Sequence, residues 1–133
     1  MTYLLDTDTI IYWLNGNQTI NQKIAAVGFE NLAFSIISKA ELYYGAYNSA
    51  HVVRNIASIE LLSNRMAMLP LNNESASHFG LIKSTLKKQG LPILDADIFI
   101  AAIAIANGLT LVTNNEKHYA RIQDVQIENW IKK

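Results

Sequence analysis

Short apolar segments alternate with longer segments of helical spacing along almost the entire chain. The apolar segments have the length of buried β-strands and occur at residues 3–5, 32–37, 66–71, 109–112 and 125–127. The segments between them predict helices at residues 9–14, 18–27, 38–47, 50–64, 73–88, 97–106 and 115–122. Strands that alternate with helices pair in parallel. We therefore predict an α/β fold, a three-layer α/β/α sandwich with a central, mostly parallel sheet of about five strands.

The length of the chain and its lack of cysteine limit the number of domains and the kinds of site that it can form. A chain of 133 residues has the size of one ordinary domain, so we expect a single domain over residues 1–133. Without cysteine, neither a disulfide framework nor a thiolate metal site can form. The longest apolar run, residues 98–106, is too short to cross a bilayer, and the N-terminus has no basic signal segment. We expect a cytoplasmic protein with no membrane partner.

Polar side chains follow the predicted strands at points where a parallel sheet binds its ligands. Asp6 follows the first strand, and Thr113 and Asn115 follow the fourth. Glu41 and Asp97 stand in the first turns of two helices. Because ligands bind beyond the carboxyl ends of such strands, these groups are expected to converge. Carboxylates so close repel one another unless a cation neutralises them, and hard ions such as Mg²⁺ or Mn²⁺ prefer oxygen ligands.

Helix capping is an alternative explanation for most of these acidic residues. Asp6 or Asp8 has the position of an N-cap for the first helix. The segment Ser38-Lys39-Ala40-Glu41 fits a capping box, in which the glutamate bonds back to the serine amide. Asp95 and Asp97 are two residues apart and face different ways on a helix. We interpret Asp95 as the N-cap and Asp97 as the functional group.

The histidines and aromatic residues are weaker candidates. The three histidines are scattered at positions 51, 78 and 118, which makes a zinc site a poor fit, and His118 is expected at the surface. The net charge is zero, which argues against a general nucleic-acid binder. Aromatic residues are unusually dense in two segments, and core packing and a partner groove explain them equally well. These residues are Tyr12, Trp13, Tyr43, Tyr44 and Tyr47.

Four segments in order resemble one known family. They are Leu4-Leu5-Asp6-Thr7-Asp8-Thr9-Ile10-Ile11, Ser38-Lys39-Ala40-Glu41-Leu42 with Gly45, Asp97 with Ile100-Ala101-Ala102, and Leu111-Val112-Thr113-Asn114-Asn115. Together they resemble the PIN-domain ribonucleases, most closely the VapC toxins of bacterial toxin–antitoxin pairs. The resemblance covers essentially the whole chain.

The resemblance implies a PIN-like sandwich and an Mg²⁺-dependent endoribonuclease, with Mn²⁺ as the alternative ion. The implied substrate is RNA, with tRNA or another structured RNA as candidates. The implied partners are a second copy of the chain, in a homodimer, and a small VapB-like antitoxin, in a toxin–antitoxin hetero-oligomer. The antitoxin is expected to inhibit the nuclease.

The family's acidic positions fall on Asp6, Glu41 and Asp97, which the resemblance identifies as catalytic and metal-binding residues. The fourth acidic position falls on Asn115, a departure that removes one negative charge. Asp8, Thr113 and Asn115 are expected to support the site.

Two alternatives from other classes remain open at this stage. The segment Asp6-Thr7-Asp8-Thr9 is similar to the paired-aspartate signature of haloacid dehalogenase-like phosphatases, with Asp6 as nucleophile and Asp8 as acid/base. Alternatively, the chain is a non-catalytic PIN-like interaction module whose carboxylates are only helix caps. Specific Mg²⁺ or Mn²⁺ binding would raise the stability of an enzyme but not of such a module.

Overall fold

The computed structural model describes residues 1–131. Residues 132 and 133, the end of the predicted domain over residues 1–133, lie outside that range. The elements follow in the order β1 (Tyr3–Leu5), α1 (Thr7–Leu14), α2 (Gln18–Val27), a 3₁₀ turn (Phe29–Asn31), β2 (Leu32–Ser35), α3 (Ile36–Tyr47), α4 (Val52–Ser63), β3 (Ala67–Leu69), α5 (Asn73–Lys88), α6 (Asp95–Ala106), β4 (Thr110–Val112), α7 (Glu116–Tyr119) and β5 (Ile127–Glu128).

Five parallel strands form the central sheet, in the order β3-β2-β1-β4-β5. The predicted α/β/α sandwich is confirmed. β1, the first strand in sequence, lies in the middle, where Leu4 pairs with Ala33 of β2 and Leu111 of β4. β3 lies at an edge of the sheet, and Pro70 follows it directly. Proline has no N–H to donate to a neighbouring strand, so an edge is the place that tolerates it.

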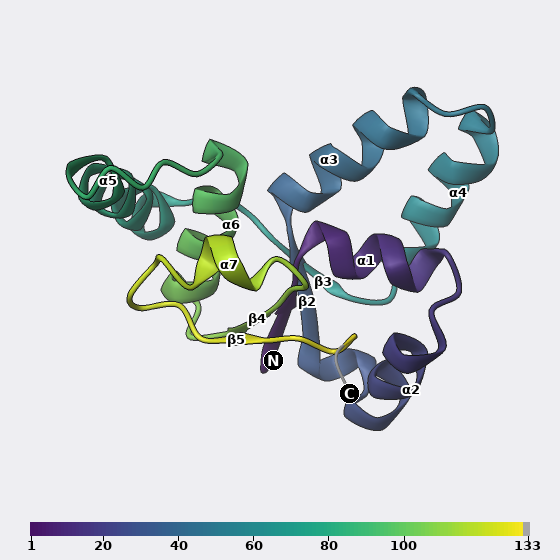
Figure 1. The fold of residues 1–133 in the computed structure, drawn as a ribbon. Helices are drawn as coiled ribbons and strands as arrows, with labels where there is room; N and C mark the ends of the chain where they lie inside the picture. Colours follow the sequence, from purple (N-terminus) through teal and green to yellow (C-terminus); the bar gives the residue numbers. More distant parts are fainter. Residues whose placement is uncertain (132–133) are drawn as a thin grey trace.

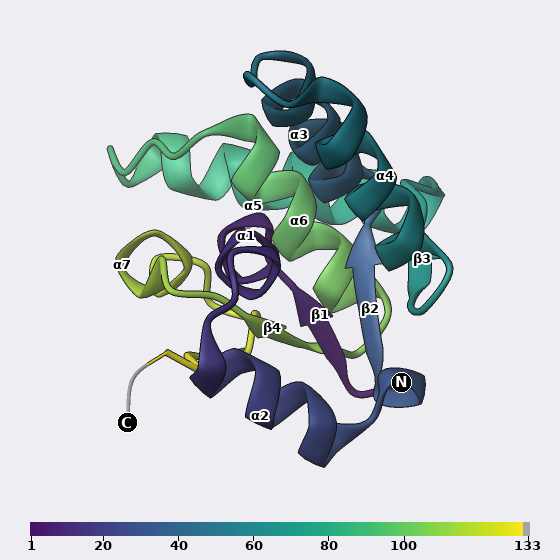
Figure 2. The ribbon, with the colours of Figure 1, turned by 90° about the vertical axis from the view of Figure 1, so that its right-hand side faces the viewer.

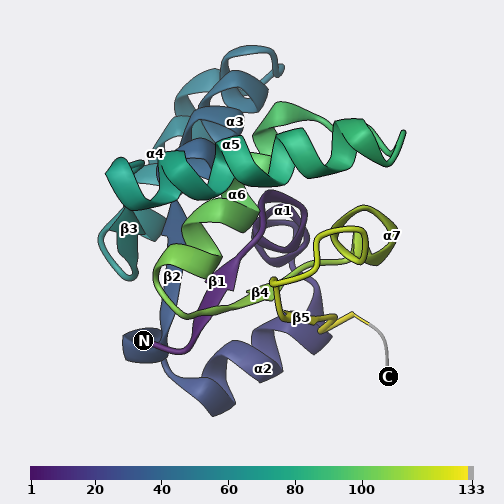
Figure 3. The same ribbon diagram turned by 90° about the vertical axis from the view of Figure 1, so that its left-hand side faces the viewer.

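The two faces of the sheet pack against different helices because successive side chains of a strand point in opposite directions. Leu5 and Phe34 belong to a core with residues of α1, α2, α3 and α4. Leu4 and Ala33 belong to a second core with residues of α5, α6 and α7. Figure 1 shows the sheet between these two groups of helices, and Figure 3 shows α5 lying across α6.

The helix boundaries differ from the prediction mainly at N-termini and at the end of the chain. α2 and α5 have the predicted bounds, whereas α1, α3 and α6 each begin two residues earlier than expected. α7 is shorter than predicted, and β5 starts at Ile127 rather than at position 125. Within residues 1–131, no helix is both long and apolar enough to span a bilayer.

We expect Leu5→Ala to destabilise the protein by about 2–5 kcal/mol, because it leaves a cavity beside the central strand. The Leu5 side chain is fully buried, with 0% exposure. Leu61→Ala on α4 is the matched control, because Leu61 is 66% exposed, and its cost should stay below about 0.5 kcal/mol. Urea denaturation measures both values. Equal losses in the two variants would contradict the assigned core.

Candidate active site

Asp6 connects the middle strand of the sheet to its neighbour. It is the N-cap of α1, and its Oδ1 accepts a hydrogen bond from the Thr7 amide at 2.8 Å. Its Oδ2 accepts a hydrogen bond from the Thr113 hydroxyl, just after β4, also at 2.8 Å. Asp6 is 4% exposed and Thr113 is fully buried. The capping explanation for Asp6 is therefore correct, and the same carboxylate also stands where β1 and β4 end.

Burial makes the Asp6 carboxylate an unusually weak acid. Loss of hydration raises its pKa to about 7, and the nearby charges of Asp8 and Asp97 also act to raise it, against the hydrogen bonds from Thr113 and Thr7. The Asp6 carboxylate therefore lies close enough to Asp8 and Asp97 to feel their charge. A bound cation would favour the ionised form of Asp6.

Asp8 fastens the start of α1 to the loop after β4. Its Oδ2 accepts a hydrogen bond from the Asn114 amide at 3.0 Å, and its Oδ1 accepts one from the Thr9 hydroxyl at 3.2 Å. The Thr9 hydroxyl also lies 3.1 Å from the Val112 carbonyl oxygen. Burial raises the pKa of Asp8 above its ordinary value. Asp8 is thus an acceptor that orders the site and adds negative charge beside Asp6.

Glu41 is not part of a capping box. α3 begins at Ile36, and Ser35 is its N-cap, accepting a hydrogen bond from the Ser38 amide at 3.0 Å. The Glu41 Oε1 instead accepts a hydrogen bond from the Thr7 hydroxyl at 2.7 Å. That hydroxyl also lies 2.8 Å from the Ser38 Oγ. Thr7, the residue after Asp6, therefore places the Glu41 carboxylate at the same edge of the sheet.

Asp97 and Asp95 have separate roles, but Asp95 is not the N-cap of α6 as predicted. Leu94 holds the cap position without a side-chain hydrogen bond, and Asp95 forms an ion pair with Lys83 of α5 at 2.9 Å. The Oδ1 of Asp97 lies 3.4 Å from the Tyr119 hydroxyl, and its Oδ2 lies 3.5 Å from the His118 Nδ1. The first turn of α6 therefore meets α7 through Asp97.

Two residues of α7 also lie at the site, although they do not directly follow a predicted strand. His118, expected at the surface, lies against Asp97 and is 2.8 Å from the Asn115 Nδ2. Tyr119 is fully buried. Burial raises the Tyr119 pKa far above its ordinary value, and the carboxylates of Asp6 and Asp97 add to this effect. The Tyr119 hydroxyl therefore stays protonated and acts as a donor. The sequence feature that could have indicated His118 and Tyr119 is their position in the turn after Asn115.

The predicted site residues gather around the carboxyl ends of β1, β2 and β4. Figures 1 and 2 show α1, α3 and α6 meeting above this edge of the sheet. Within residues 1–131, no three or more histidine, cysteine, aspartate or glutamate side chains stand close enough to hold a metal ion as they are. The donor set still fits Mg²⁺, because this ion keeps several waters and needs only one or two protein carboxylates. Asp6 and Asp97 could supply these.

The sequence matches a known family model over almost its whole length. The match is to the PIN domain and covers residues 3–124. The chain belongs to the PIN domain family. A haloacid dehalogenase-like phosphatase is therefore the wrong class for Asp6 and Asp8.

Relatives of this PIN domain match it end to end. It is 38% identical over 134 residues to "Ribonuclease VapC1" of Haemophilus influenzae (strain R2866), covering 99% of this chain and 100% of the relative. It is 32% identical over 130 residues to "tRNA(fMet)-specific endonuclease VapC" of Salmonella typhimurium, covering 98% of each.

Solved structures of similar PIN domains agree with the fold. The chain in the structure of VapBC-1 from nontypeable Haemophilus influenzae has a TM-score of 0.90 at 37% identity, covering 99% of this chain and 100% of that one. The chain in the DNA-bound VapBC from Salmonella typhimurium has a TM-score of 0.93 at 32% identity, covering 98% of each.

We expect the metal-free protein to lose stability as pH rises from about 4 to about 7. The reason is that Asp6 in the unfolded chain ionises near the ordinary aspartate pKa of 3.8, whereas folded Asp6 ionises near 7. Above pH 7 both states are ionised, and this contribution is constant. Asp6→Asn keeps the capping acceptor and removes the charge, so at pH 8 without metal it should be more stable by roughly 2–4 kcal/mol.

Thermal and urea denaturation in EDTA at pH 5 and pH 8 measure this difference. Asp124→Asn is the control, because Asp124 is exposed, and it should follow the wild-type pH dependence. If Asp6→Asn and Asp124→Asn gave the same pH profile, the raised pKa of Asp6 would be refuted.

Proposed function

We propose that this chain is a metal-dependent endoribonuclease, the toxin of a VapC-type toxin–antitoxin pair. The observation that carries the proposal is the end-to-end match, at 38% identity, to a protein named Ribonuclease VapC1. The geometry supports it, because acidic residues from the end of β1, from α3 and from α6 lie at one edge of the sheet. We propose the cytoplasm, where RNA is available, as its location, and residues 1–133 as its single domain.

Asp6, Glu41 and Asp97 are the proposed catalytic and metal-binding residues, and Mg²⁺ is the proposed ion. When bound, a divalent cation supplies positive charge that offsets the phosphodiester and makes a water molecule a better nucleophile. Glu41, held by the Thr7 hydroxyl, is placed to orient the attacking water and accept its proton. Thr113 stabilises the ionised form of Asp6 through its hydrogen bond.

The other site residues support this chemistry. Asp8 adds negative charge, and the Asn115 backbone amide donates to the Thr113 Oγ1 at 2.9 Å, which orders the hydroxyl that bonds to Asp6. Tyr119 stays a neutral donor beside Asp97. Since the attacking group is water rather than the ribose 2′-hydroxyl, cleavage should leave a 5′-phosphate.

The proposed partners are RNA, a second copy of this chain and a VapB-like antitoxin. The similar solved structures are, by name, of VapBC-1 and of a DNA-bound VapBC. An apolar hollow between α1, α3 and α4 lies beside Glu41 and is lined in part by Ile11, Leu14, Leu42 and Ile59. Exposed aromatic residues of α3, Tyr44 and Tyr47, extend this surface. An antitoxin segment seated there would lie next to the active site.

Glu41→Gln should leave the fold intact and reduce RNA cleavage by roughly 100-fold or more, the usual contribution of a general base. Glutamine can still accept the Thr7 hydrogen bond but cannot take up the proton. Single-turnover cleavage of a purified tRNA in Mg²⁺, with circular dichroism as the folding check, measures the effect. Glu60→Gln is the control, since Glu60 is also a hydrogen-bonded helix glutamate. Full activity of Glu41→Gln would remove Glu41 from the mechanism.

Asp97→Asn should abolish cleavage while the melting temperature stays the same or rises, because a repelling charge is removed. Asp95→Asn, in the same helical turn but paired with Lys83, should cleave like the wild type. Sequencing of the cleaved RNA should find 5′-phosphate ends. Ends with a 2′,3′-cyclic phosphate would instead indicate a metal-free mechanism, and an active Asp97→Asn would remove Asp97 from the proposed site. A wild type that cleaves no RNA would favour the non-catalytic module.

A further inference from the structure

Three donor side chains stand together where the first turn of α6 meets α7. The His118 Nδ1 lies 3.5 Å from the Asp97 Oδ2 and 2.8 Å from the side-chain amide nitrogen of Asn115. The three residues come from the start of α6, the N-cap of α7 and α7 itself. The His118 Nδ1 therefore lies next to both Asp97 and Asn115, and the proposed function assigns His118 no role.

The composition of this group departs from an all-carboxylate site. Asn115 occupies the position that resembles the family's fourth acidic residue, and it carries no charge. The His118 ring lies beside Asp97 instead. A site built from carboxylate, amide and imidazole has one nitrogen ligand among its oxygens, and imidazole favours transition-metal ions, whereas Mg²⁺ prefers oxygen.

The distances are compatible with one shared ion. Neighbouring ligands on a six-coordinate ion at about 2.1–2.2 Å lie roughly 3 Å from each other, so a small side-chain rotation brings the Asp97 Oδ2 and the His118 Nδ1 to that spacing. A half-turn of the Asn115 amide exchanges its nitrogen and oxygen with almost no change of shape. The amide oxygen would then face the same point.

Both principal donors can be reached by an ion. The Asp97 side chain is 17% exposed and the His118 side chain is 41% exposed. The other oxygen of Asp97, Oδ1, is occupied by the hydroxyl of buried Tyr119. Tyr119 thus orients the carboxylate so that its Oδ2 faces His118.

We propose that His118 and Asp97, assisted by the Asn115 amide, bind a second divalent cation in the active site and make that position select a transition-metal ion over Mg²⁺. The inference rests on the proposed metal-dependent function. It assigns to His118 the place that a fourth carboxylate would otherwise take, with a different metal preference as the consequence.

The test uses the full-length, RNA-free protein with Mn²⁺ and Mg²⁺ as separate probes. Titration calorimetry measures affinity, and pulsed electron paramagnetic resonance of bound Mn²⁺ detects a coordinated nitrogen. We expect the wild type to show nitrogen coupling. His118→Gln should lose that coupling and about tenfold or more in Mn²⁺ affinity, with less than about threefold change for Mg²⁺.

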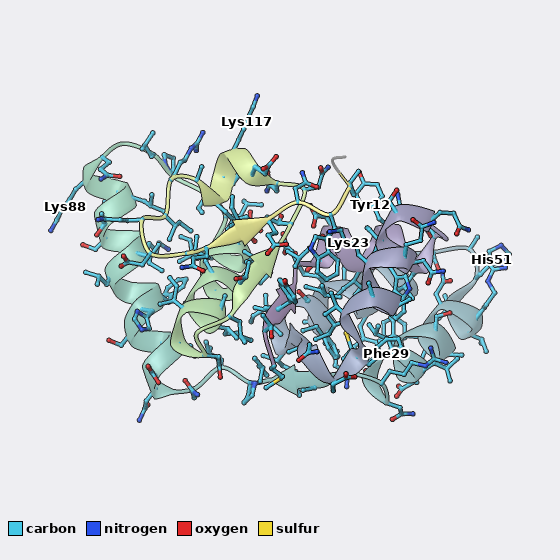
Figure 4. The ribbon with its side chains drawn as sticks, turned by 90° about the horizontal axis from the view of Figure 1, so that it is seen from below. Tyr12, Lys23, Phe29, His51, Lys88 and Lys117 are labelled. Atoms are coloured by element: carbon cyan, nitrogen blue, oxygen red, sulfur yellow. The ribbon has the colours of Figure 1, made fainter. Side chains whose placement is uncertain are left out.

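The two other histidines provide the controls. Figure 4 shows His51 at the far end of the molecule from Lys117 of α7, and His78 lies on α5. A double variant, His51→Gln with His78→Gln, should keep the nitrogen coupling and both affinities. Retained coupling in that variant assigns the signal to His118 even if His118→Gln fails to fold.

Bound Mn²⁺ without nitrogen coupling, or equal losses for the two ions in His118→Gln, would overturn this inference alone. RNA cleavage that still depends on Mg²⁺ and on Asp97 would then leave the proposed function standing. A wild type that binds neither ion and cleaves RNA in EDTA would overturn both.

Discussion

The buried carboxylate of Asp6 is the interaction on which the rest of this site depends. A carboxylate that is only 4% exposed is costly to ionise unless donors or cations compensate. The Thr7 amide and the Thr113 hydroxyl provide part of that compensation. The Thr113 bond also links the end of β1 to the end of β4, so the carboxylate that is costly to ionise also connects the two strands. A cation provides the remaining compensation in the proposed function.

The parallel sheet explains why residues so far apart in sequence reach Asp6. β1 lies in the middle of the sheet with β2 and β4 on either side, and the helices after these strands begin at one edge. Glu41 arrives from α3 and is connected to this edge by Thr7. Asp97 arrives from α6, which is packed by its apolar residues against the other face. The site therefore lies where the two layers of helices meet.

α7 adds a different kind of group to this arrangement. It brings His118 and Tyr119 onto Asp97, one as a nitrogen donor and one as a permanent hydroxyl donor. Asn115 contributes no charge, so the negative potential of the site comes from Asp6, Asp8, Glu41 and Asp97. This balance is the physical basis for expecting a metal preference that differs from that of an all-carboxylate site.

The sequence by itself determined the α/β class, the parallel sheet and the edge at which Asp6, Glu41 and Asp97 would stand, because strand and helix periodicity depends on local residue spacing. It did not determine which serine caps α3, that Asp95 pairs with Lys83, or that His118 lies against Asp97. Capping patterns are short and degenerate, so Ser35 and Ser38 are equally suitable by local rules. Only the tertiary structure decided these contacts, because a side chain bonds to the partner that packing brings within reach. Packing places the Thr7 hydroxyl next to Glu41 and α5 next to Asp95.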